Sequence, residues 1–376
     1  MAASHRKEVL MERKPVIVGV VGAGAISDIY LTNMTTRFPF LRVKSVCANH
    51  IENARKKAEK YGISACTLEE MLADPEIELI VNLTPTHAHY DIIRKALNAG
   101  KHVYTEKTLT ESPDTAADLT VLAREKGLFL ASAPDTFLGS AWQTARKAID
   151  DKLIGDVTSF AMVANRDATF MDSLNAFRNQ PGGGACYNYI VYYISCLVSL
   201  LGSVRKVASI CQAPMPERVN INPQSPHFGK VIRTPNESQV YSLLCLRSGV
   251  CGTFHLNEES VLMDQAYFAI YGTKGILYLT DPNGFGGDVR FLPNSYDFQN
   301  MPKPEVLPNR FDYSDNSRGV GPADVAMAIR TGSAIRPNAQ LAAHVMEVLT
   351  AMMKNEEFTY ILSECERPAP MPMIGE

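Results

Sequence analysis

A run of glycines leads directly into an apolar, helix-like segment that carries polar side chains suited to chemistry. The stretch reads PGGGACYNYIVYYISCLVSLLG, from Pro181 to Gly202. Asn188 and Tyr192 are four residues apart, so on an α-helix they share one face, and Ser195 follows three residues later. The segment is either a buried helix that packs aromatic rings or the helix of an active site, and the rest of the chain has to separate these interpretations.

Glu106 and Lys107 form a second reactive pair, in GKHVYTEKTLT at the end of a predicted strand. Ligands of open parallel sheets bind beyond the carboxyl ends of the strands. A lysine beside a nicotinamide can hold a substrate hydroxyl and its developing oxyanion by charge-assisted hydrogen bonds. The alternative is a charged pair that only marks the loop after the strand.

The preceding predicted strand ends at the same edge of the sheet, in NLTPTHAH. We expect Thr84 and Pro85 to line the nicotinamide pocket there, and we include His89 among the cofactor-binding residues. His87 and His89 fit helix-start or packing positions better than catalytic ones. Asp135, in APDTF, ends the fifth predicted strand near the same edge, and we expect it to contact the cofactor or the substrate.

A glycine turn follows the first predicted strand. VIVGVVGAGAIS has Gly22 and Gly24 after the strand and Ser27 where a third glycine is common. Gly22 allows a tight turn, and Gly24 lets a pyrophosphate approach the backbone. The helix that begins there offers free N–H groups to phosphates, so Ala25 and Ile26 belong to the expected site. The order strand, turn, helix, strand favours dinucleotide binding over a plain structural turn.

The tip of the second predicted strand indicates which dinucleotide binds. It reads CANHIEN, so Asn49 stands where an acidic residue commonly holds the adenosine ribose. Asn49 can still hydrogen-bond the 2′-hydroxyl, and it does not repel a 2′-phosphate. No Lys or Arg follows before Arg55. We therefore favour NAD over NADP.

Composition excludes several classes of protein. The formal charge of −3 over 376 residues, with no basic run, argues against nucleic acid as a partner. The polar N-terminus lacks the apolar core of a signal peptide, and no apolar stretch reaches the roughly 20 residues that span a bilayer. None of the eight cysteines forms a CxxC pair, so we expect no zinc site, no other metal site and no disulfide framework. The expectation is a soluble, reduced, cytoplasmic protein.

The order of predicted elements gives the fold class. Short apolar strands alternate with helices in the first half, which is typical of parallel βαβ units. After about residue 140, longer alternating segments with hairpin turns indicate an antiparallel sheet with a few helices. We predict an α/β protein: a doubly wound Rossmann domain at 15–138, then an α+β domain with a large, mostly antiparallel open sheet at 139–358. Polar tails occupy 1–14 and 359–376. The segment from Met301 to Gly319 is predicted to be a long surface loop.

Several stretches together resemble the Gfo/Idh/MocA oxidoreductases, named for glucose–fructose oxidoreductase, inositol dehydrogenase and a rhizopine-catabolism protein. They are VGVVGAGAIS, VNLTPTHAHYDIIRKALNAGKHVYTEKTLT, APDTFLG, PGGGACYN, YGTKGILYLTDPNGFGG and DNSRGVGPADVAMAIRTG. The resemblance covers the chain from about Pro15 to Phe358. It implies a nicotinamide cofactor, sugars or related alcohols as substrates, and homo-oligomers formed through the exposed face of the second domain's sheet.

The resemblance also identifies residues, and the chain departs from the family pattern at two of them. The family's Glu-Lys-Pro motif corresponds to Glu106, Lys107 and Thr108, so the lysine is kept and the proline is lost. The family's catalytic helix carries an Asp and, four residues later, a His. Here these positions are Asn188 and Tyr192, although some relatives also have Tyr at the His position.

We hypothesise that Lys107 and Tyr192 form the acid/base unit and that Asn188 orients the substrate. Free tyrosine has a pKa of about 10, too high for an efficient base near neutrality, and a nearby ammonium lowers it. The predicted reaction oxidises a secondary hydroxyl of a sugar or glycoside to a keto-sugar, for example at C3, with hydride transfer to nicotinamide. The alternatives are an inositol or polyol dehydrogenase, and a non-catalytic sensor that binds a dinucleotide and a sugar.

Overall fold

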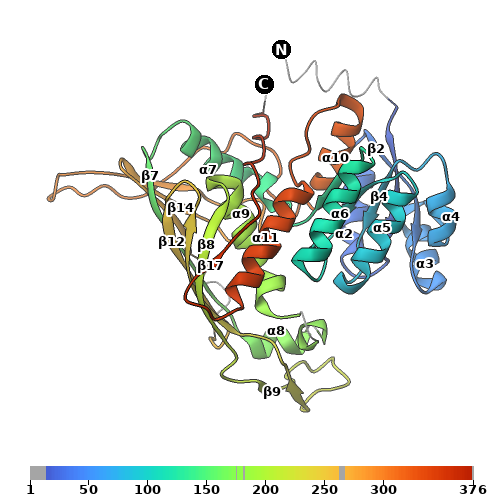
Figure 1. Cartoon of the computed structure of the whole chain (residues 1–376), viewed down its shortest axis with the longest axis horizontal. Helices are drawn as coiled ribbons and strands as arrows, with labels where there is room; N and C mark the ends of the chain where they lie inside the picture. The colour runs from blue at the N-terminus through green and yellow to red at the C-terminus, as the bar shows by residue number, and fades with distance from the viewer. Residues whose placement is uncertain (1–13, 175, 181–182, 262–266, 375–376) are drawn as a thin grey trace. The chain divides into compact units, whose positions relative to one another are not determined.

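The computed structural model describes residues 14–174, 176–180, 183–261 and 267–374, and these form two compact units (Figure 1). Unit 1 comprises Met1–Gly139, Phe311–Ala343 and Pro368–Glu376, and unit 2 comprises Ser140–Arg310 and His344–Arg367. The division therefore differs from the single boundary expected near residue 138. Residues 311–343 belong with the first unit because α10 (Val320–Thr331) contacts strands of its sheet.

Unit 1 contains a sheet of six strands in the order β3-β2-β1-β4-β5-β6. All its pairings are parallel, and chain order reverses between β1 and β4. The strands are short and almost wholly buried, as expected when helices cover both faces. They are β1 (Val16–Val21), β2 (Leu41–Cys47), β3 (Ser64–Ala65), β4 (Leu79–Asn82), β5 (His102–Thr105) and β6 (Leu130–Ser132).

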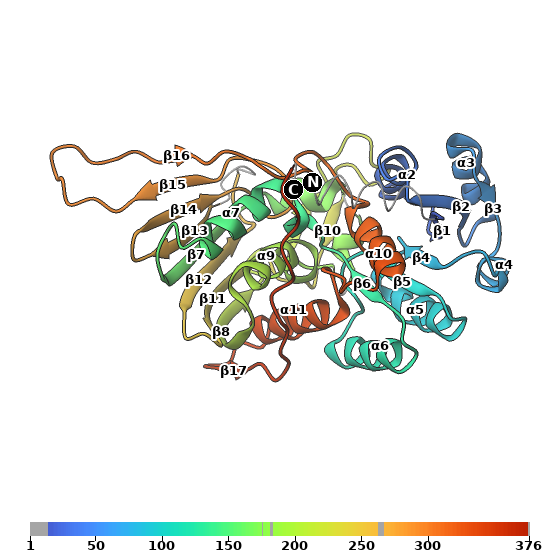
Figure 2. The same cartoon turned by 90° about the horizontal axis from the view of Figure 1, so that it is seen from above.

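Helices lie on both faces of this sheet. In Figure 2, α2 (Ser27–Thr36) and α3 (Ile51–Tyr61) lie on one face, and α5 (His89–Asn98) and α6 (Pro113–Glu125) on the other. Local sequence explains the helix ends: α6 has Pro113 in its first turn and Ser112 as its N-cap, accepting from Thr115 N. The shorter helices are α4 (Leu68–Ala73) and the 3₁₀ turns η1 (Thr86–Ala88) and η2 (Thr136–Leu138).

Unit 2 is built on a sheet of nine strands in the order β16-β15-β14-β13-β7-β12-β11-β8-β17. Only the pairing of β12 with β7 is parallel. The strands are β7 (Val157–Asn165), β8 (Val204–Gln212), β11 (Gln239–Leu246), β12 (Cys251–Asn257), β13 (Tyr267–Gly272), β14 (Gly275–Leu279), β15 (Arg290–Pro293), β16 (Glu305–Val306) and β17 (Thr359–Tyr360). A separate ribbon pairs β9 (Glu217–Val219) with β10 (Val231–Arg233).

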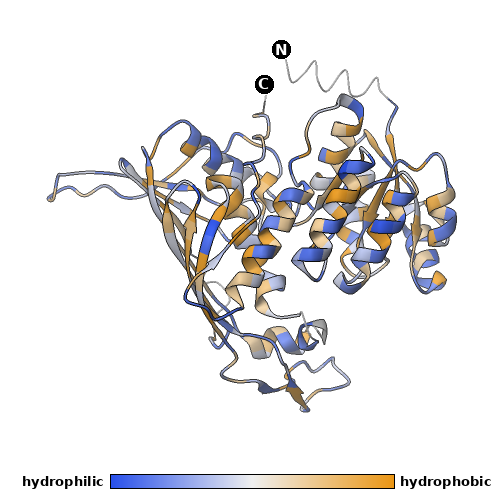
Figure 3. Cartoon of the chain, viewed as in Figure 1, coloured by the Kyte–Doolittle hydropathy of each residue, from blue (hydrophilic) through white to orange (hydrophobic). Residues whose placement is uncertain are grey.

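One face of the nine-stranded sheet is buried beneath helices. Figure 2 shows α7 (Ser140–Asp150) and α9 (Val191–Leu201) on the same side of it, and Figure 3 shows α9 as a largely apolar helix. Alternate residues of β7 and β12 are buried, whereas those between them are partly exposed. The sheet therefore has one core face and one open face. The remaining helices are α8 (Ala168–Leu174), η3 (Ala176–Asn179), the π-helical turn η4 (Cys186–Ile190) and α11 (Ala339–Met352).

The predicted fold class is confirmed, with local differences. The segment predicted as a surface loop contributes β16, and the predicted C-terminal tail contributes β17. Nearer the C-terminus, the Arg336 guanidinium donates hydrogen bonds to the carbonyl oxygens of Ala369 and Pro370 in this tail. Polar, Pro-rich composition hid these contacts because it is typical of exposed loops.

The prediction of uniformly reduced cysteines is wrong for one pair. Cys245 and Cys251 face each other across β11 and β12 and form a disulfide. A hairpin turn brings together two residues that lie six apart in the sequence, a spacing outside the CxxC pattern. Across the described ranges, no helix is both long enough and apolar enough to cross a membrane.

Candidate functional site

The glycine turn lies where strand order reverses, at the carboxyl ends of β1 and β4. Gly22 has φ +108°, and its N–H donates to Cys47 O at 2.8 Å. A Cβ at Gly22 would stand 2.8 Å from the backbone carbon and oxygen of Leu83. Only glycine tolerates both this conformation and this approach. Doubly wound sheets bind ligands at such a reversal point.

The turn leaves an open backbone at the start of α2. Gly24, Ala25 and Ile26 are exposed, and a Cβ built on Gly24 meets nothing within 4 Å. The Ser27 hydroxyl donates to Gly24 O at 2.6 Å. The buried serine at the third glycine position is thus hydrogen-bonded to the backbone of the turn. These residues fit a dinucleotide pyrophosphate, because the backbone is accessible and the turn leads into the N-terminus of α2, the positive end of the helix dipole.

Other expected cofactor residues lie along the same edge. Asn49 is exposed just after β2, the neighbour of β1. Thr84 follows β4, is half-buried, and donates from its hydroxyl to Asn82 Oδ1 at 2.8 Å. Pro85 is exposed beside it. The parallel sheet thus brings together residues that lie far apart in the sequence.

His89 ties two strand-end loops together. Its side chain is fully buried, with Nε2 2.9 Å from Thr84 O and Nδ1 2.7 Å from Thr108 O. Burial lowers the pKa of this imidazole, against the two carbonyl contacts, which act to raise it. His89 therefore supports the loops that carry Thr84 and Lys107 from inside the protein.

Glu106 and Lys107 lie at the end of β5, the strand next to β4. The Tyr30 hydroxyl donates to Glu106 Oε1 at 2.7 Å, and Lys107 N donates to Glu106 Oε2 at 2.9 Å. Lys107 itself is only partly buried. The glutamate is thus held on both oxygens, and the lysine follows it at the edge where the expected cofactor residues lie.

Asp135 is fully enclosed in the protein. Its Oδ2 accepts from Gly321 N at 2.8 Å, and it is hydrogen-bonded to Tyr104. Burial raises the pKa of this carboxyl to about 6, against the lowering effects of the Gly321 N–H and of Arg318. The sequence offered no sign of these partners, because they come from β5 and from the start of α10.

In unit 2, the predicted catalytic segment begins as a π-helix. The Val191 N–H donates to Cys186 O, five residues back, across η4. Asn188 lies within this turn and is half-buried, whereas Tyr192, in the first turn of α9, is 8% exposed. Because a π turn holds more residues than an α turn, the expected common face of these two residues is altered. Single π turns are frequent at functional sites.

Aromatic and charged side chains surround this helix start. The Arg166 guanidinium lies 3.9 Å from the centre of the Tyr189 ring, and the Tyr189 hydroxyl donates to Asp281 Oδ2 at 3.0 Å. Burial, and then Asp281, raise the pKa of Tyr189. Arg166 directly follows β7. Its stacking on Tyr189 holds the π turn against β7.

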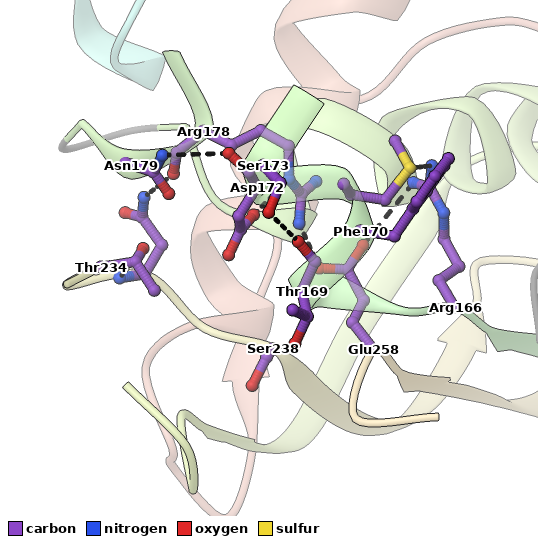
Figure 4. A network of polar contacts seen from close by, with 12 residues as sticks. Arg166, Thr169, Phe170, Asp172, Ser173, Arg178, Asn179, Thr234, Ser238 and Glu258 are labelled. Carbon is purple, nitrogen blue, oxygen red and sulfur yellow. Dashed lines mark hydrogen bonds and ion pairs between the residues drawn. The ribbon is translucent and has the colours of Figure 1, made fainter. Parts of the chain in front are cut away.

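A buried ion network extends from Arg166 (Figure 4). Arg178 donates to Asp172 Oδ1 at 2.8 Å and to Glu258 Oε2 at 2.5 Å, and Glu258 also lies 3.6 Å from Arg166. All four charges are at least four-fifths buried, and burial raises the pKa of Glu258. The sequence gives no sign of this network, because its members come from α8, η3 and the ends of β7 and β12, with no common spacing.

Comparisons with known proteins agree with this geometry. Residues 16–133 match the oxidoreductase family with an NAD-binding Rossmann fold, and residues 142–278 match the GFO/IDH/MocA C-terminal domain. The chain is 26% identical to trans-1,2-dihydrobenzene-1,2-diol dehydrogenase of Mus musculus, over 69% of this chain and 72% of that protein. It is 31% identical to dTDP-3,4-didehydro-2,6-dideoxy-alpha-D-glucose 3-reductase of Streptomyces violaceoruber, over 50% of this chain and 56% of that protein.

The fold is similar to that of levoglucosan dehydrogenase solved in complex with NADH. The TM-score is 0.81 at 18% identity, over 93% of this chain and 100% of that one. The chain spans about half the length of several curated relatives that it matches, between 54% and 56%. Because both of its domains match the two domains of one family, the chain belongs to the Gfo/Idh/MocA oxidoreductases.

Proposed function

We propose that the protein is an NAD-dependent dehydrogenase that oxidises a secondary hydroxyl of a sugar or glycoside to a keto-sugar, for example at C3. The observation that carries the proposal is the shared edge of the unit 1 sheet. The Gly22–Gly24 turn and the Glu106–Lys107 pair lie at the carboxyl ends of β1 and β5, which flank β4. Hydride transfer needs a bound nicotinamide and a cation near the reacting oxygen, and this edge offers groups for both.

Each catalytic residue has a distinct role in the proposal. Tyr192 takes the proton of the substrate hydroxyl, and the Lys107 ammonium stabilises the phenolate and the developing oxyanion. Asn188 orients a second substrate hydroxyl, since its amide both donates and accepts hydrogen bonds. The nicotinamide, when bound, supplies the hydride acceptor. The π turn supports this assignment, because it occurs where the segment carries Asn188.

NAD is the preferred cofactor in the proposal. Asn49 lies exposed beyond β2, and its side-chain amide can form a hydrogen bond with the ribose 2′-hydroxyl. Because the side chain carries no charge, it does not repel the 2′-phosphate of NADP, so NADP stays possible as a cofactor. Measured dissociation constants for NADH and NADPH, from the fluorescence of bound nicotinamide, decide between them.

The names of the relatives support a carbohydrate or cyclic alcohol as substrate. One relative is a reductase of a dTDP-linked keto-sugar, one neighbour acts on levoglucosan, and another relative is described as an inositol dehydrogenase. A polyol such as an inositol is therefore the second candidate. The test incubates the protein with NAD⁺ and levoglucosan, glucose, simple glycosides or myo-inositol, and follows the absorbance of reduced nicotinamide. Mass spectrometry of the ligands released on unfolding would detect a cofactor that stays tightly bound to the protein.

We also propose a homo-oligomer formed through the open face of the nine-stranded sheet. This face carries partly exposed apolar side chains at Ile210 on β8, Leu243 on β11 and Tyr267 on β13. Apolar side chains gathered on one sheet face are typical of interfaces between subunits. A second copy of the chain would cover them.

A further inference from the structure

The loop between β10 and β11 in unit 2 contacts the chain just before the glycine run that leads into η4. It comprises residues 234–238, whose first and last members are labelled in Figure 4. The Asn236 side-chain amide donates to Arg178 O at 2.6 Å and to Gln180 O at 2.7 Å. Gln180 O also accepts from Gly183 N at 3.0 Å. The loop therefore holds the backbone at the point where the chain enters the run.

Glu237, the next residue of this loop, contacts the chain just after the run. Its Oε1 accepts from Cys186 N at 2.7 Å. Cys186 is the first residue of η4, and the N–H groups at the start of a helix have no partner within the helix. Glu237 supplies such a partner. Two neighbouring side chains of one loop thus hold the chain on both sides of the run.

Gly184 lies directly against the Glu237 carboxylate. A Cβ built on Gly184 would stand 2.5 Å from Glu237 Oε1 and still closer to Oε2. The φ angle of Gly184 is not positive, so its backbone conformation is open to other residues. The close approach of the carboxylate, and not the backbone conformation, is therefore the reason for a glycine at this position.

The contacts of Glu237 lead to Asn188 through the backbone. Asn188 N donates to Gly184 O at 3.1 Å, and Gly184 is the residue on which the carboxylate packs. On the other side of Asn188, the Tyr189 hydroxyl donates to Asp281 Oδ2 at 3.0 Å. Asn188 thus lies between a backbone segment held by Glu237 and a ring held by Asp281.

We propose that Glu237 is a positioning residue, which holds Gly184 and Cys186 and thereby fixes Asn188 in the π turn. Asn236 holds the chain before the run, so the run is anchored at both ends. The effect on substrate orientation rests on the proposed function, in which Asn188 orients a substrate hydroxyl. The hold on the π turn does not rest on it.

Glu237→Ala and Glu237→Gln separate the acceptor oxygen from the rest of the side chain. The glutamine amide oxygen can still accept from Cys186 N, whereas alanine leaves that N–H without this partner. Gly184→Ala reaches the same contact from the other side. Its methyl group must displace the carboxylate, and the end of a flexible side chain can move while the protein stays folded.

Glu347→Ala is the matched control. Glu347 is also a half-buried carboxylate of unit 2 that accepts from backbone N–H groups, those of Leu362 at 2.7 Å and Ser363 at 2.9 Å. It lies on α11, and these two partners belong to the C-terminal segment of the chain. The control therefore removes the same kind of contact from another part of the unit.

The first measurement is amide hydrogen exchange, read by mass spectrometry on a peptide that spans η4. Glu237→Ala and Gly184→Ala should speed exchange there several-fold, up to about tenfold, the effect of one lost hydrogen bond. Glu237→Gln and Glu347→Ala should match the wild type in this peptide. Unchanged exchange in both Glu237→Ala and Gly184→Ala would overturn the proposal. So would equally fast exchange in Glu347→Ala, which would mean a general loosening of the unit.

The second measurement is kcat and KM with the best substrate of the wild type. Glu237→Ala and Gly184→Ala should lower kcat by about 10- to 100-fold and change KM much less, because the bound substrate loses its orientation. Glu237→Gln should restore kcat to within a few-fold of the wild type, and Glu347→Ala should not lower it. A wild-type kcat in Glu237→Ala, or an equal loss in Glu237→Gln, would contradict the positioning role.

The two measurements also separate this proposal from the proposed function. If the wild type oxidises none of the substrates, the proposed function fails, and with it the role of Glu237 in orienting a substrate. Hydrogen exchange still decides whether Glu237 holds the π turn, since that measurement needs no turnover.

Discussion

Gly22 lies directly against the backbone of Leu83, so that a Cβ at Gly22 would stand 2.8 Å from the Leu83 carbonyl carbon and oxygen. The two residues follow β1 and β4, the neighbouring strands between which chain order reverses. This contact brings the glycine turn and the Thr84 loop to one edge. Gly24, two residues later, has no such neighbour, so the two glycines have different roles.

Gly22→Ala should therefore affect the stability of the protein, whereas Gly24→Ala should affect cofactor binding. Gly22→Ala places a side chain at φ +108° and against backbone atoms, which should lower the free energy of unfolding by about 2 kcal/mol or more. Gly24→Ala should leave stability unchanged and weaken NADH binding by about tenfold, because the new methyl group would occupy the space that we propose for the pyrophosphate. Urea unfolding and nicotinamide fluorescence measure the two effects. Equal NADH affinity in Gly24→Ala and the wild type would remove Gly24 from the site.

The sequence was sufficient for the glycine turn and insufficient for what lies behind it. The strand, Gly22, Gly24 and the following helix form a local pattern, so their geometry could be predicted. Behind the turn, Tyr30 of α2 donates to Glu106 after β5, and Gly321 of α10 donates to Asp135 after β6. These residues have no regular spacing, and only the folded sheet brings them together.

The helix of the predicted acid/base unit illustrates the same limit. Its apolar pattern and glycine start predicted a buried helix, and α9 is buried over most of its length. Tertiary contacts surround the π turn at Cys186–Ile190: Arg166 stacks on Tyr189, and the Glu237 carboxylate accepts from Cys186 N. These partners are distant in the sequence, so helical periodicity alone predicted an α-helix.

Asp135 should make stability depend on pH. Its pKa is raised from 3.8 to about 6 in the folded protein. The folded state thus binds the proton more tightly than the unfolded state, so stability is complete below pH about 4 and is lost as the pH rises through about 6. The difference of about 2 pKa units corresponds to about 3 kcal/mol. Urea unfolding at pH 4.5 and 7.5 should show this loss in the wild type.

Asp135→Asn is the reference for that experiment, since all other titrating groups are common to both proteins. The variant should lack the loss that is due to Asp135, so its stability relative to the wild type should improve with rising pH. A constant difference between the two proteins at both pH values would show that Asp135 has an ordinary pKa in the folded state.

Arg178→Met should strongly destabilise unit 2. Arg178 pairs with Asp172 and Glu258, and all three side chains are almost fully buried. Removing the guanidinium leaves two carboxylates without their main partner, which should cost about 3–5 kcal/mol. Lys152→Met is the control, because the exposed pair of Lys152 with Asp156 should contribute nothing measurable. Thermal unfolding that is equal for both variants would mean that the buried network is dispensable.

Leu243→Lys should dissociate the proposed oligomer. Leu243 lies on the open face of β11 and is 40% exposed, so a lysine there is tolerated in the monomer but not beneath a second subunit. Val121→Lys is a matched control, since Val121 is also 40% exposed but lies on α6 of unit 1. Light scattering after size-exclusion chromatography gives the mass of each variant. A wild-type monomer, or an oligomer that survives Leu243→Lys, would contradict the proposed interface.

Tyr192→Phe and Lys107→Ala test the proposed acid/base unit. Each should lower kcat by about 10²–10⁴-fold, the usual contribution of a positioned proton-transfer group. Tyr187→Phe, the control, removes a tyrosine hydroxyl from the neighbouring turn, where Tyr187 contacts Thr350 at 3.0 Å, and should leave kcat within a few-fold. NADH should still bind to Tyr192→Phe, because no cofactor contact is assigned to that residue.

The most direct test is the initial rate of NAD⁺ reduction with the best substrate among levoglucosan, glucose, glycosides and myo-inositol, compared between the wild type and Tyr192→Phe. The account predicts a clear rate of nicotinamide reduction by the wild type and a loss of at least about 100-fold in the variant. A variant within a few-fold of the wild type would show that Tyr192 is not the base. A wild type that binds NADH and reduces NAD⁺ with none of these compounds would contradict the proposed dehydrogenase and favour a sensor.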